Sequence, residues 1–541
     1  MVDTHFPEHF NIASHFLDEP ARRHPRRTAI LGEPQEVSYE ELAQLASRVG
    51  NALLSERCER GDRVLIALPD SAEFIAAFFG AAKIGAVPTP VNSMARAADY
   101  EHYLGDCGPR IAIVHSSAVA EFLRGLEKSP QTAVILAGDE SAYTGSLKCR
   151  YWTDWVSASS ARLTPAATTP FDPAALLYTS GSGGMPNGAI HQHKDMLVAS
   201  RGFAQEVLGL SANDITFSVS KLFFAYGLGN GMYFPLLVGA QTLLNPERTK
   251  VARVAELVSI RRPTVFFAVP TFYAALLREA ERNEEMDFSS VRIAVSAGEM
   301  LPVEIYERFR RRFGLEILDG IGSTEMLHIF LSSRPGAIRP GSCGPPTPGY
   351  EARILDDDGR EVGDGVMGNL WVSGASAFAR YWNKPELTSR VKQGNWVSTG
   401  DKFIRDADGY HFYCGRADDM LKISGMWVSP IEIENVLLGH PLVAEAAAVG
   451  CTDAYGLTQT VAFVVLRQGL VGSAELAKEI REHVRTRLVP FKCPRQLRFC
   501  AELPKTADSD EGNQYSGLIV ISIPGWRDQS SERSDAGFCI L

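Results

Sequence analysis

The sequence has no long hydrophobic run, no paired cysteines and no excess of basic residues. No stretch of about 18 apolar residues occurs, so the chain offers no candidate membrane-spanning helix. Its nine cysteines show neither CxxC pairs nor metal-ligand spacing, which argues against a disulfide framework or a zinc site. The net charge of -10 argues against a nucleic-acid partner. Residues 1–16 carry acids and histidines where a secretory signal needs a basic start, so we predict a cytoplasmic protein.

Apolar runs and helical stretches alternate along most of the chain. Strand-like runs at 63–68 and 111–114 flank a helical stretch at 74–84. The same rhythm returns between residues 241 and 295, which favours parallel sheets covered by helices. After Gly341, short strands and turns indicate a compact β subdomain.

From Asp418 the pattern becomes that of a small α+β unit. Its predicted elements are a helix at 429–438, strands at 446–449 and 460–466, and a helix at 474–488. We therefore predict an α/β fold with a large N-terminal domain, residues 1–417, made of two parallel-type α/β subdomains and a β subdomain. A mobile C-terminal lid domain, residues 418–507, and an atypical tail, residues 508–541, complete the prediction.

A loop rich in Gly, Ser and Thr follows an apolar run at 174–177. Small side chains let backbone N–H groups and hydroxyls approach a polyphosphate, so the loop predicts phosphate binding. It does not fit the GxxxxGK[ST] pattern, and such a loop by itself is more often only a flexible turn. Its sequence is Tyr178-Thr-Ser-Gly-Ser-Gly-Gly-Met-Pro-Asn-Gly188.

Three further motifs follow in order and strengthen this interpretation. They are Asp319-Gly-Ile-Gly-Ser-Thr-Glu325, Ser398-Thr-Gly-Asp401 and Gly415-Arg-Ala-Asp-Asp-Met-Leu-Lys-Ile-Ser-Gly425. With them, residues 10–507 resemble the adenylate-forming superfamily of acyl-CoA synthetases, luciferases and peptide-synthetase adenylation domains. The resemblance implies ATP, Mg²⁺ and coenzyme A, with an acyl-AMP formed first and a pantetheine thiol attacking it second.

The resemblance also implies a role for each matching residue. Glu325 would hold Mg²⁺, which prefers hard oxygen ligands, Thr324 would meet the α-phosphate, and Asp418 would be the hinge of the lid. The ATP phosphates would lie over Thr179, Ser180, Gly181, Ser182, Gly183 and Gly184. Adenine and ribose would contact Ser296, Ala297, Gly298, Glu299, Asp319, Gly320, Ile321, Gly322, Asp401 and Arg416, and the coenzyme A tunnel would run along Lys422, Ser424, Gly425 and Trp427.

Two segments, 221–231 and 322–330, resemble the acid pocket of benzoate and 4-hydroxybenzoate CoA ligases. Their aromatic and aliphatic side chains could sandwich a flat ring, and their small residues could leave space for it. His328 or Tyr226 could form a hydrogen bond with a ring substituent. We therefore predict a small aromatic carboxylic acid, benzoate or 4-hydroxybenzoate, as substrate. The rival interpretation makes these aromatics ordinary core residues. The predicted pocket consists of Phe224, Ala225, Tyr226, Gly229, His328 and Ile329.

The sequence departs from the family pattern at three positions. Asn187 stands where the family has a lysine, Gly183 where it has a threonine, and Asp510 where the adenylating lysine would fall. A carboxylate at the last position would repel the acid and the α-phosphate, so we predict impaired adenylation and a less affected thioester step. We attribute residues 508–541 to an altered reading frame or a replaced terminus, which the nucleotide sequence would test.

Three alternatives stay open at this stage. The chain could be a relative that binds nucleotide without turning it over, and Asn187 and Asp510 support this alternative. It could load an acyl group onto a carrier protein, although no carrier module follows residue 507. It could also be a luciferase-like oxygenase, which light emission or oxygen uptake would reveal. A homodimer is left open as its assembly.

Overall fold

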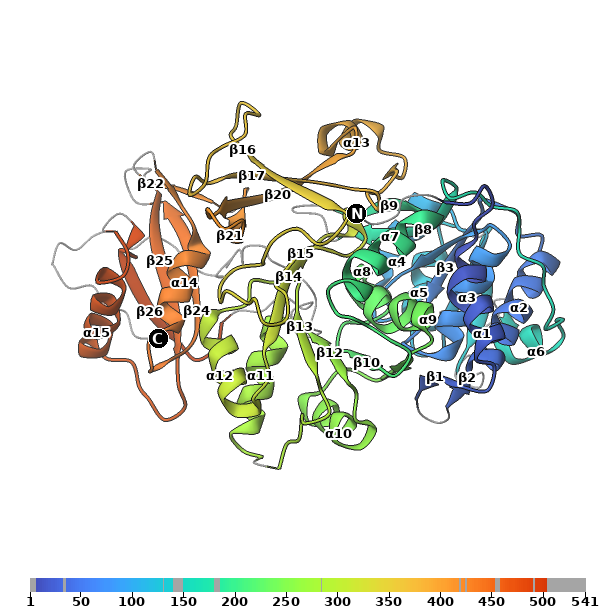
Figure 1. Ribbon diagram of the computed structural model, residues 1–541, viewed down its shortest axis with the longest axis horizontal. Coiled ribbons are helices and arrows are strands. Elements are labelled where there is room, and N and C mark those ends of the chain that lie inside the picture. The colour runs from blue at the N-terminus through green and yellow to red at the C-terminus, as the bar shows by residue number, and fades with distance from the viewer. Residues whose placement is uncertain are drawn as a thin grey trace.

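The computed structural model describes residues 6–32, 36–129, 131–139, 149–179, 185–283, 285–417, 420–423, 426–452, 458–489 and 492–503. These residues form two large parallel-type sheets, a small antiparallel sheet, a β subdomain and a separate C-terminal domain (Figure 1). The predicted α/β fold class is confirmed. None of the helices in these ranges is long and apolar enough to cross a membrane.

The first sheet is entirely parallel and lies near the N-terminus. Its strand order is β4 (Val87–Pro90), β3 (Arg63–Ala67), β5 (Ile111–His115), β6 (Ala133–Ala137) and β7 (Arg150–Tyr151). Its helices are α2 (Tyr39–Ser55), α3 (Ala72–Lys83), α4 (Ala97–Cys107), α5 (Val119–Leu126) and α6 (Trp152–Ser157), and η1 (Ser14–Asp18) and α1 (Glu19–Arg23) precede them.

Helix α3 lies in the core of this subdomain. Its residues from Phe74 to Ala82 are uncharged and buried on every face of the helix. Ser71 caps its N-terminus by accepting a hydrogen bond from the backbone N–H of Phe74. A Cβ on Gly80 would lie 2.8 Å from the Ala46 carbonyl oxygen of α2, so the two helices can approach this closely only at a glycine.

The second sheet has eight strands and forms the centre of the molecule. Its order is β15 (Ile329–Ser332), β14 (Ile317–Gly322), β13 (Ile293–Ser296), β12 (Val265–Ala268), β10 (Ile215–Ser218), β11 (Gln241–Leu243), β1 (Thr28–Leu31) and β2 (Val37–Ser38). All neighbours from β14 to β1 are parallel, and only the outermost strands are antiparallel. Helices α10 (Val251–Arg261), α11 (Pro270–Ala280) and α12 (Val303–Phe313) lie beside β12, β13 and β14 in Figure 1.

A three-stranded antiparallel sheet connects to the β subdomain. It consists of β8 (Pro173–Thr179), β9 (Asn187–Gln192) and β18 (Arg380–Tyr381). The helical segments that follow β9 and β10 are α7 (His193–Ala199), η3 (Ser200–Gln205), α8 (Ala225–Leu228), η4 (Gly229–Tyr233) and α9 (Phe234–Val238). The β subdomain contains β16 (Tyr350–Leu355), β17 (Gly368–Gly374), β19 (Lys392–Gln393), β20 (Trp396–Arg405), β21 (His411–Arg416) and α13 (Pro385–Val391).

The C-terminal domain is a small α+β unit, as predicted. It holds the hairpin of β22 (Leu421–Ile423) and β23 (Met426–Val428), the sheet β24 (Val443–Thr452), β25 (Thr458–Leu466) and β26 (Gln496–Cys500), and helices α14 (Pro430–Leu438) and α15 (Ala474–Arg485). Strand β24 is longer than its predicted apolar segment because it pairs with β25 from Val443 to Thr452. Helix α15 ends at Arg485, three residues earlier than predicted, where the Arg487 N–H donates to the Val484 carbonyl and tightens the chain into a three-residue turn.

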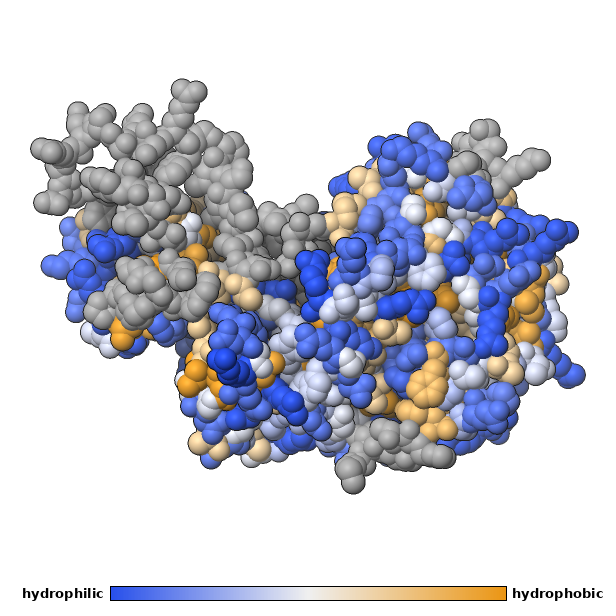
Figure 2. Space-filling model, turned by 90° about the horizontal axis from the view of Figure 1, so that it is seen from above, coloured by the Kyte–Doolittle hydropathy of each residue, from blue (hydrophilic) through white to orange (hydrophobic). Residues whose placement is uncertain are grey.

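The coloured surface of the face in Figure 2 is mainly hydrophilic, with hydrophobic residues in small separate groups. Scattered apolar residues of this kind are normal for a protein surface. The apolar side chains instead form clusters between the sheets and helices.

Candidate active site

The β8–β9 hairpin holds both ends of the predicted phosphate loop. Thr179 ends β8 and pairs with Asn187, which begins β9. The Lys384 ammonium donates a 2.6 Å hydrogen bond to Asn187 Oδ1. A cation therefore lies beside the position where the family lysine is missing. Residues 180–184, predicted to cover the phosphates, lie outside the described residues.

The short helix η5 (Thr324–Met326) follows β14 and carries the predicted catalytic pair. The Tyr381 hydroxyl donates to Glu325 Oε1 at 2.5 Å, and the Phe378 N–H donates to the Glu325 carbonyl at 2.7 Å. Burial and the adjacent carboxylate raise the pKa of Tyr381, so it stays a neutral donor.

The metal implied by the family fits this turn. Proteins hold Mg²⁺ through one or two carboxylates, and substrate phosphates and waters complete its shell. Glu325 is half-buried and offers one such carboxylate. The part of the chain that the structure describes has no group of three or more His, Cys, Asp or Glu that could hold a metal without substrate.

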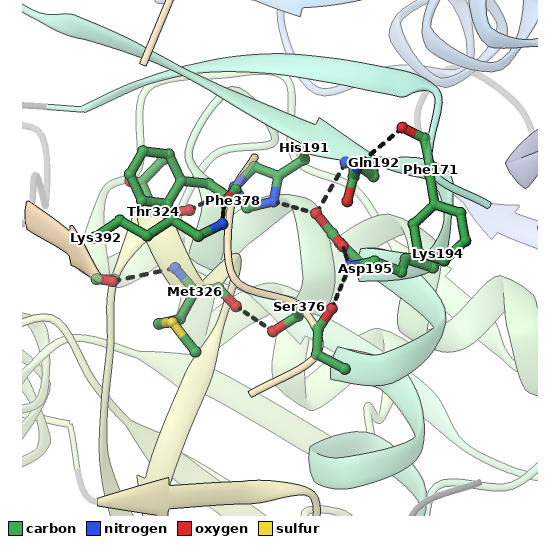
Figure 3. Close-up of polar contacts among 12 residues, drawn as sticks. Phe171, His191, Gln192, Lys194, Asp195, Thr324, Met326, Ser376, Phe378 and Lys392 are labelled. Carbon is green, nitrogen blue, oxygen red and sulfur yellow. Dashed lines mark hydrogen bonds and ion pairs between the residues drawn. The ribbon is translucent and has the colours of Figure 1, made fainter. Parts of the chain in front are cut away.

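Three buried polar side chains adjoin the η5 turn, and we call them the His191 network: His191, Lys194 and Asp195 (Figure 3). His191 places Nε2 2.7 Å from the Thr324 carbonyl oxygen and Nδ1 3.0 Å from Asp195 Oδ2. Asp195 also accepts from the Gln192 N–H at 2.8 Å and from the Lys194 ammonium at 2.6 Å.

The predicted adenine residues lie at the carboxyl ends of β13 and β14, where open α/β sheets bind ligands. Ser296 and Asp319 are register partners on these strands. Ser296 Oγ and Asp319 Oδ1 are buried and have no hydrogen-bond partner among the described residues. Burial raises the pKa of Asp319 well above its usual range. Buried polar atoms are normally paired, so both atoms fit contact with a polar ligand such as adenine.

Other predicted adenine residues surround this pair. Gly320, Ile321 and Gly322 complete β14, and Ala297, Gly298 and Glu299 follow β13. Glu299 accepts hydrogen bonds from the N–H and the hydroxyl of Thr271, both at 3.3 Å. Burial nevertheless raises the pKa of Glu299 to about 7.

The predicted ribose residues face each other across β20 and β21. Asp401 and Arg416 are ladder partners, and Arg416 Nη1 lies 3.0 Å from Asp401 Oδ1 and 2.9 Å from the Thr399 carbonyl oxygen. Burial raises the pKa of Asp401 to about 6, although Arg416 opposes the shift. Gly400 has φ +76°, and a Cβ there would lie 2.7 Å from the guanidinium, so the arginine packs where only glycine fits.

His328 lies in an enclosed aromatic cluster within the predicted acid pocket. Its ring centroid is 4.5 Å from that of Phe234 and 5.4 Å from that of Tyr226. His328 Nε2 faces the Tyr226 carbonyl at 3.3 Å and Asn230 Oδ1 at 3.1 Å. Both groups accept, so Nε2 carries the proton. Burial lowers the pKa of His328 to about 3, which leaves Nδ1 as a buried acceptor without a partner among the described residues.

Two details of this pocket differ from the sequence prediction. The space beside Gly229 is not left open for the acid, because a Cβ there would lie 2.5 Å from Cδ2 of the His328 ring, which fills it. The Tyr226 hydroxyl is engaged with the Val295 carbonyl at 3.4 Å, so it is less available to a ring substituent than His328 Nδ1. The remaining pocket residues are Phe224 and Ala225, which are half-buried, and Ile329, which is buried in β15.

The predicted coenzyme A tunnel falls on the β22–β23 hairpin, where Lys422 and Trp427 are register partners. Ser424 and Gly425 lie outside the described residues, as do Asp418, the predicted hinge, and Asp510, which stands where the family has a lysine.

Lys384, Tyr381 and the His191 network are functional candidates that the sequence motifs do not predict. Tyr381 and Lys384 lie in the sequence between β17 and β19 of the β subdomain, and they reach the site because β18 pairs with β9. His191 lies in β9 and Asp195 is the third residue of α7, so their contact depends on the turn from strand to helix and left no helical spacing in the sequence.

The chain belongs to the family of AMP-binding enzymes. Residues 17–382 match the AMP-binding enzyme domain and residues 432–509 match the AMP-binding enzyme C-terminal domain. The chain is similar to the benzoate–CoA ligase of Thauera aromatica, with 40% identity over 93% of this chain and 94% of that protein. It is 38% identical to the 4-hydroxybenzoate–CoA/benzoate–CoA ligase of Rhodopseudomonas palustris, over 92% of each. The crystal structure of the anthranilate CoA ligase AuaEII with anthranoyl-AMP has a TM-score of 0.88 and 36% identity, covering 94% of this chain and 96% of that chain.

Proposed function

We propose that the chain is an AMP-forming aryl-CoA ligase that activates benzoate or a hydroxybenzoate with ATP and passes the acyl group to coenzyme A. The observation that carries the proposal is the enclosed aromatic cluster around His328, formed by segments far apart in the sequence. It adjoins the residues predicted to hold ATP, so a flat ring bound there would direct its carboxylate toward the phosphates. The activities named for the similar ligases support the same class of acid.

Adenylation needs groups that stabilise negative charge on the phosphoryl oxygens. A carboxylate oxygen attacks the α-phosphorus, the bond to the bridging oxygen breaks, and pyrophosphate leaves. Thr324 would meet the α-phosphate and Glu325 would hold Mg²⁺, which would neutralise phosphate charge. Thr179 and the loop 180–184 supply hydroxyl and N–H donors, and Lys384 supplies the ammonium that Asn187 lacks.

The nucleoside is held between two chain segments. Asp319 and Ser296, with the backbone around them, line the adenine. Asp401 accepts hydrogen bonds from the ribose hydroxyls, and Arg416 keeps its carboxylate ionised and oriented.

His328 contributes to the choice among aromatic acids. Because its Nδ1 is a buried acceptor, a ring that brings a hydroxyl donor satisfies it, whereas an unsubstituted ring leaves it unpaired. We therefore expect a hydroxybenzoate whose hydroxyl reaches this nitrogen to be preferred over benzoate.

The second step uses the C-terminal domain. In our proposal this domain begins at residue 418, turns about Asp418 and brings the hairpin of Lys422 and Trp427 to the acyl-AMP, where the thiol displaces AMP. Because Asp510 replaces the adenylating lysine, we expect acyl-AMP formation to be slower than thioester formation from supplied acyl-AMP. A cytoplasmic location and a homodimer stay predictions.

The decisive experiment is mass-spectrometric detection of acyl-CoA. The purified chain is incubated with ATP, Mg²⁺ and coenzyme A and a panel of benzoate, hydroxybenzoates, anthranilate and short fatty acids. Accumulation of an aryl-CoA is the expected result, and a fatty acyl-CoA as the sole product would contradict the proposal.

A second candidate function is nucleotide binding without turnover, which Asp510 favours. It predicts measurable Mg·ATP binding, no pyrophosphate release, and no thioester even when benzoyl-AMP is supplied. Thioester formation from benzoyl-AMP would exclude this candidate, because the C-terminal domain would then be competent.

A further inference from the structure

The hydrogen-bond partners of His191 decide how many protons its ring carries. The Thr324 carbonyl can only accept, so His191 Nε2, at 2.7 Å, must carry a proton. His191 Nδ1 faces Asp195 Oδ2 at 3.0 Å, and one of these two atoms must carry a proton for them to bond. The state of Asp195 therefore decides whether the ring is neutral or charged.

Asp195 is surrounded by donors and is ionised. Its Oδ1 accepts from the Lys194 ammonium at 2.6 Å, and its Oδ2 accepts from the Gln192 N–H at 2.8 Å. Donors and a cation at hydrogen-bond distance stabilise a carboxylate over a carboxylic acid. With Asp195 ionised, His191 Nδ1 must be the donor, so both ring nitrogens carry protons and the ring is an imidazolium.

The charged ring acts on a strained turn. Leu327 has φ +71°, a left-handed conformation that costs free energy for a residue other than glycine. The Thr324 carbonyl accepts from the Leu327 N–H at 3.0 Å and from His191, so two donors fix its direction. Because a peptide group is planar, fixing this carbonyl also fixes the N–H of Glu325.

We propose that His191 is a buried positioning residue that donates from both ring nitrogens and so holds the Thr324–Glu325 turn in place for the triphosphate. The inference rests on the proposed function of Thr324 and Glu325. Within the network, the charges of His191 and Lys194 exceed that of Asp195 by one, and Lys392, whose ammonium donates to the Phe378 carbonyl, adds another cation nearby. This excess of positive charge complements an anionic ligand at the turn.

His193 provides a matched control two residues away. It is also fully buried, but its Nδ1 accepts a hydrogen bond from the Ile12 N–H at 3.2 Å, so the ring is neutral. Burial lowers the pKa of His193 to about 4. The two histidines are thus near neighbours in the sequence and equally buried, but they differ in charge and only His191 contacts the turn.

The charge state is tested by NMR of the full chain labelled with ¹⁵N-histidine. Among its 12 histidines, we expect one buried imidazolium whose two ring N–H groups are both hydrogen-bonded; its signal should disappear in His191→Gln and remain in His193→Gln. A neutral-ring signal assigned to His191 would overturn the proposal. This measurement on the unmodified protein does not depend on activity.

The positioning role is tested by Mg·ATP binding measured calorimetrically. His191→Phe, which removes both donors, should weaken binding by about ten- to hundred-fold, the size of a charge-assisted hydrogen bond. His191→Gln can keep one donor, so its affinity for Mg·ATP should lie between those of the unmodified protein and His191→Phe. His193→Gln should leave the affinity unchanged. Equal affinities for all variants, or equal losses in the His191 and His193 variants, would refute positioning. Absence of Mg·ATP binding by the unmodified chain would instead refute the proposed function, and the NMR result would still decide the charge of His191.

Discussion

Replacing Lys221 with Met should destabilise the protein by about 3–5 kcal/mol, because it leaves a buried carboxylate without its cation. Lys221 Nζ lies 3.6 Å from Asp70 Oδ2 and donates to the carbonyls of Asn245 and Glu247 at 2.6 and 2.7 Å. Asp70 is buried, and its Oδ1 accepts from the Leu222 N–H at 2.9 Å. The pair therefore joins the first sheet to the segment that begins the predicted acid pocket.

The loss of stability caused by Lys221→Met should grow as pH rises. Burial raises the pKa of Asp70 and Lys221 opposes that shift, so removing the ammonium raises the pKa further. The folded state then binds more protons than the unfolded state, in which Asp titrates near about pH 4. Relative to the unmodified protein, the variant loses up to about 1.4 kcal/mol of stability per pH unit between the Asp70 pKa of the folded unmodified protein and the higher Asp70 pKa of the folded variant. Near pH 4 only the loss of the two carbonyl contacts, about 1–3 kcal/mol, should remain.

The assay is urea unfolding followed by circular dichroism at several pH values between 4 and 8. Lys128→Met is the control, because the Lys128 side chain is 75% exposed and its pair with Glu101 is a surface contact worth below about 1 kcal/mol. Asp70→Asn combined with Lys221→Met should recover much of the loss. A deficit that is constant with pH, or a double variant no more stable than the single one, would refute the reasoning.

Other changes test the site directly. Lys384→Met should weaken Mg·ATP binding by about ten-fold, and Asn187→Lys in the same chain should restore it, since each supplies one ammonium to the phosphates. Calorimetric titration measures both, and no recovery would contradict the assignment. Tyr381→Phe should raise the Mg²⁺ concentration needed for nucleotide binding, because Glu325 loses a 2.5 Å hydrogen bond; an unchanged Mg²⁺ dependence would argue against it. Gly229→Ala should cost about 1–3 kcal/mol by overpacking the adjacent imidazole, which a lower thermal midpoint would show.

Much of the fold could be predicted from the sequence because its elements are locally encoded. The apolar run at 63–68 became β3, and the apolar helix beginning near residue 74 became α3, which Ser71 caps and the turn at Gly85 ends. Strand β24 and helix α15 differed in length because pairing with β25 and turns after Val484 depend on neighbours rather than on the local pattern.

The site contacts that the sequence did not predict join residues far apart in the chain. Lys384 contacts a residue 197 positions away, and His191 contacts Thr324 across 133 positions, so neither contact leaves a local sequence pattern. The space beside Gly229 was misjudged for a similar reason, because its filling residue, His328, comes from the turn before β15. The motif residues were easier to select because order and spacing within one chain define them.

The pairing of β18 with β9 has a consequence for how the chain can be divided. A fragment ending before Arg380 would leave β9 as an open edge and remove the groups that contact Asn187 and Glu325. Residues 380–384 therefore belong to the nucleotide-binding body although the β subdomain continues after them. A two-piece version of the protein, reassembled from separately expressed halves, should be cut beyond Lys384 to keep its nucleotide-binding half folded and soluble.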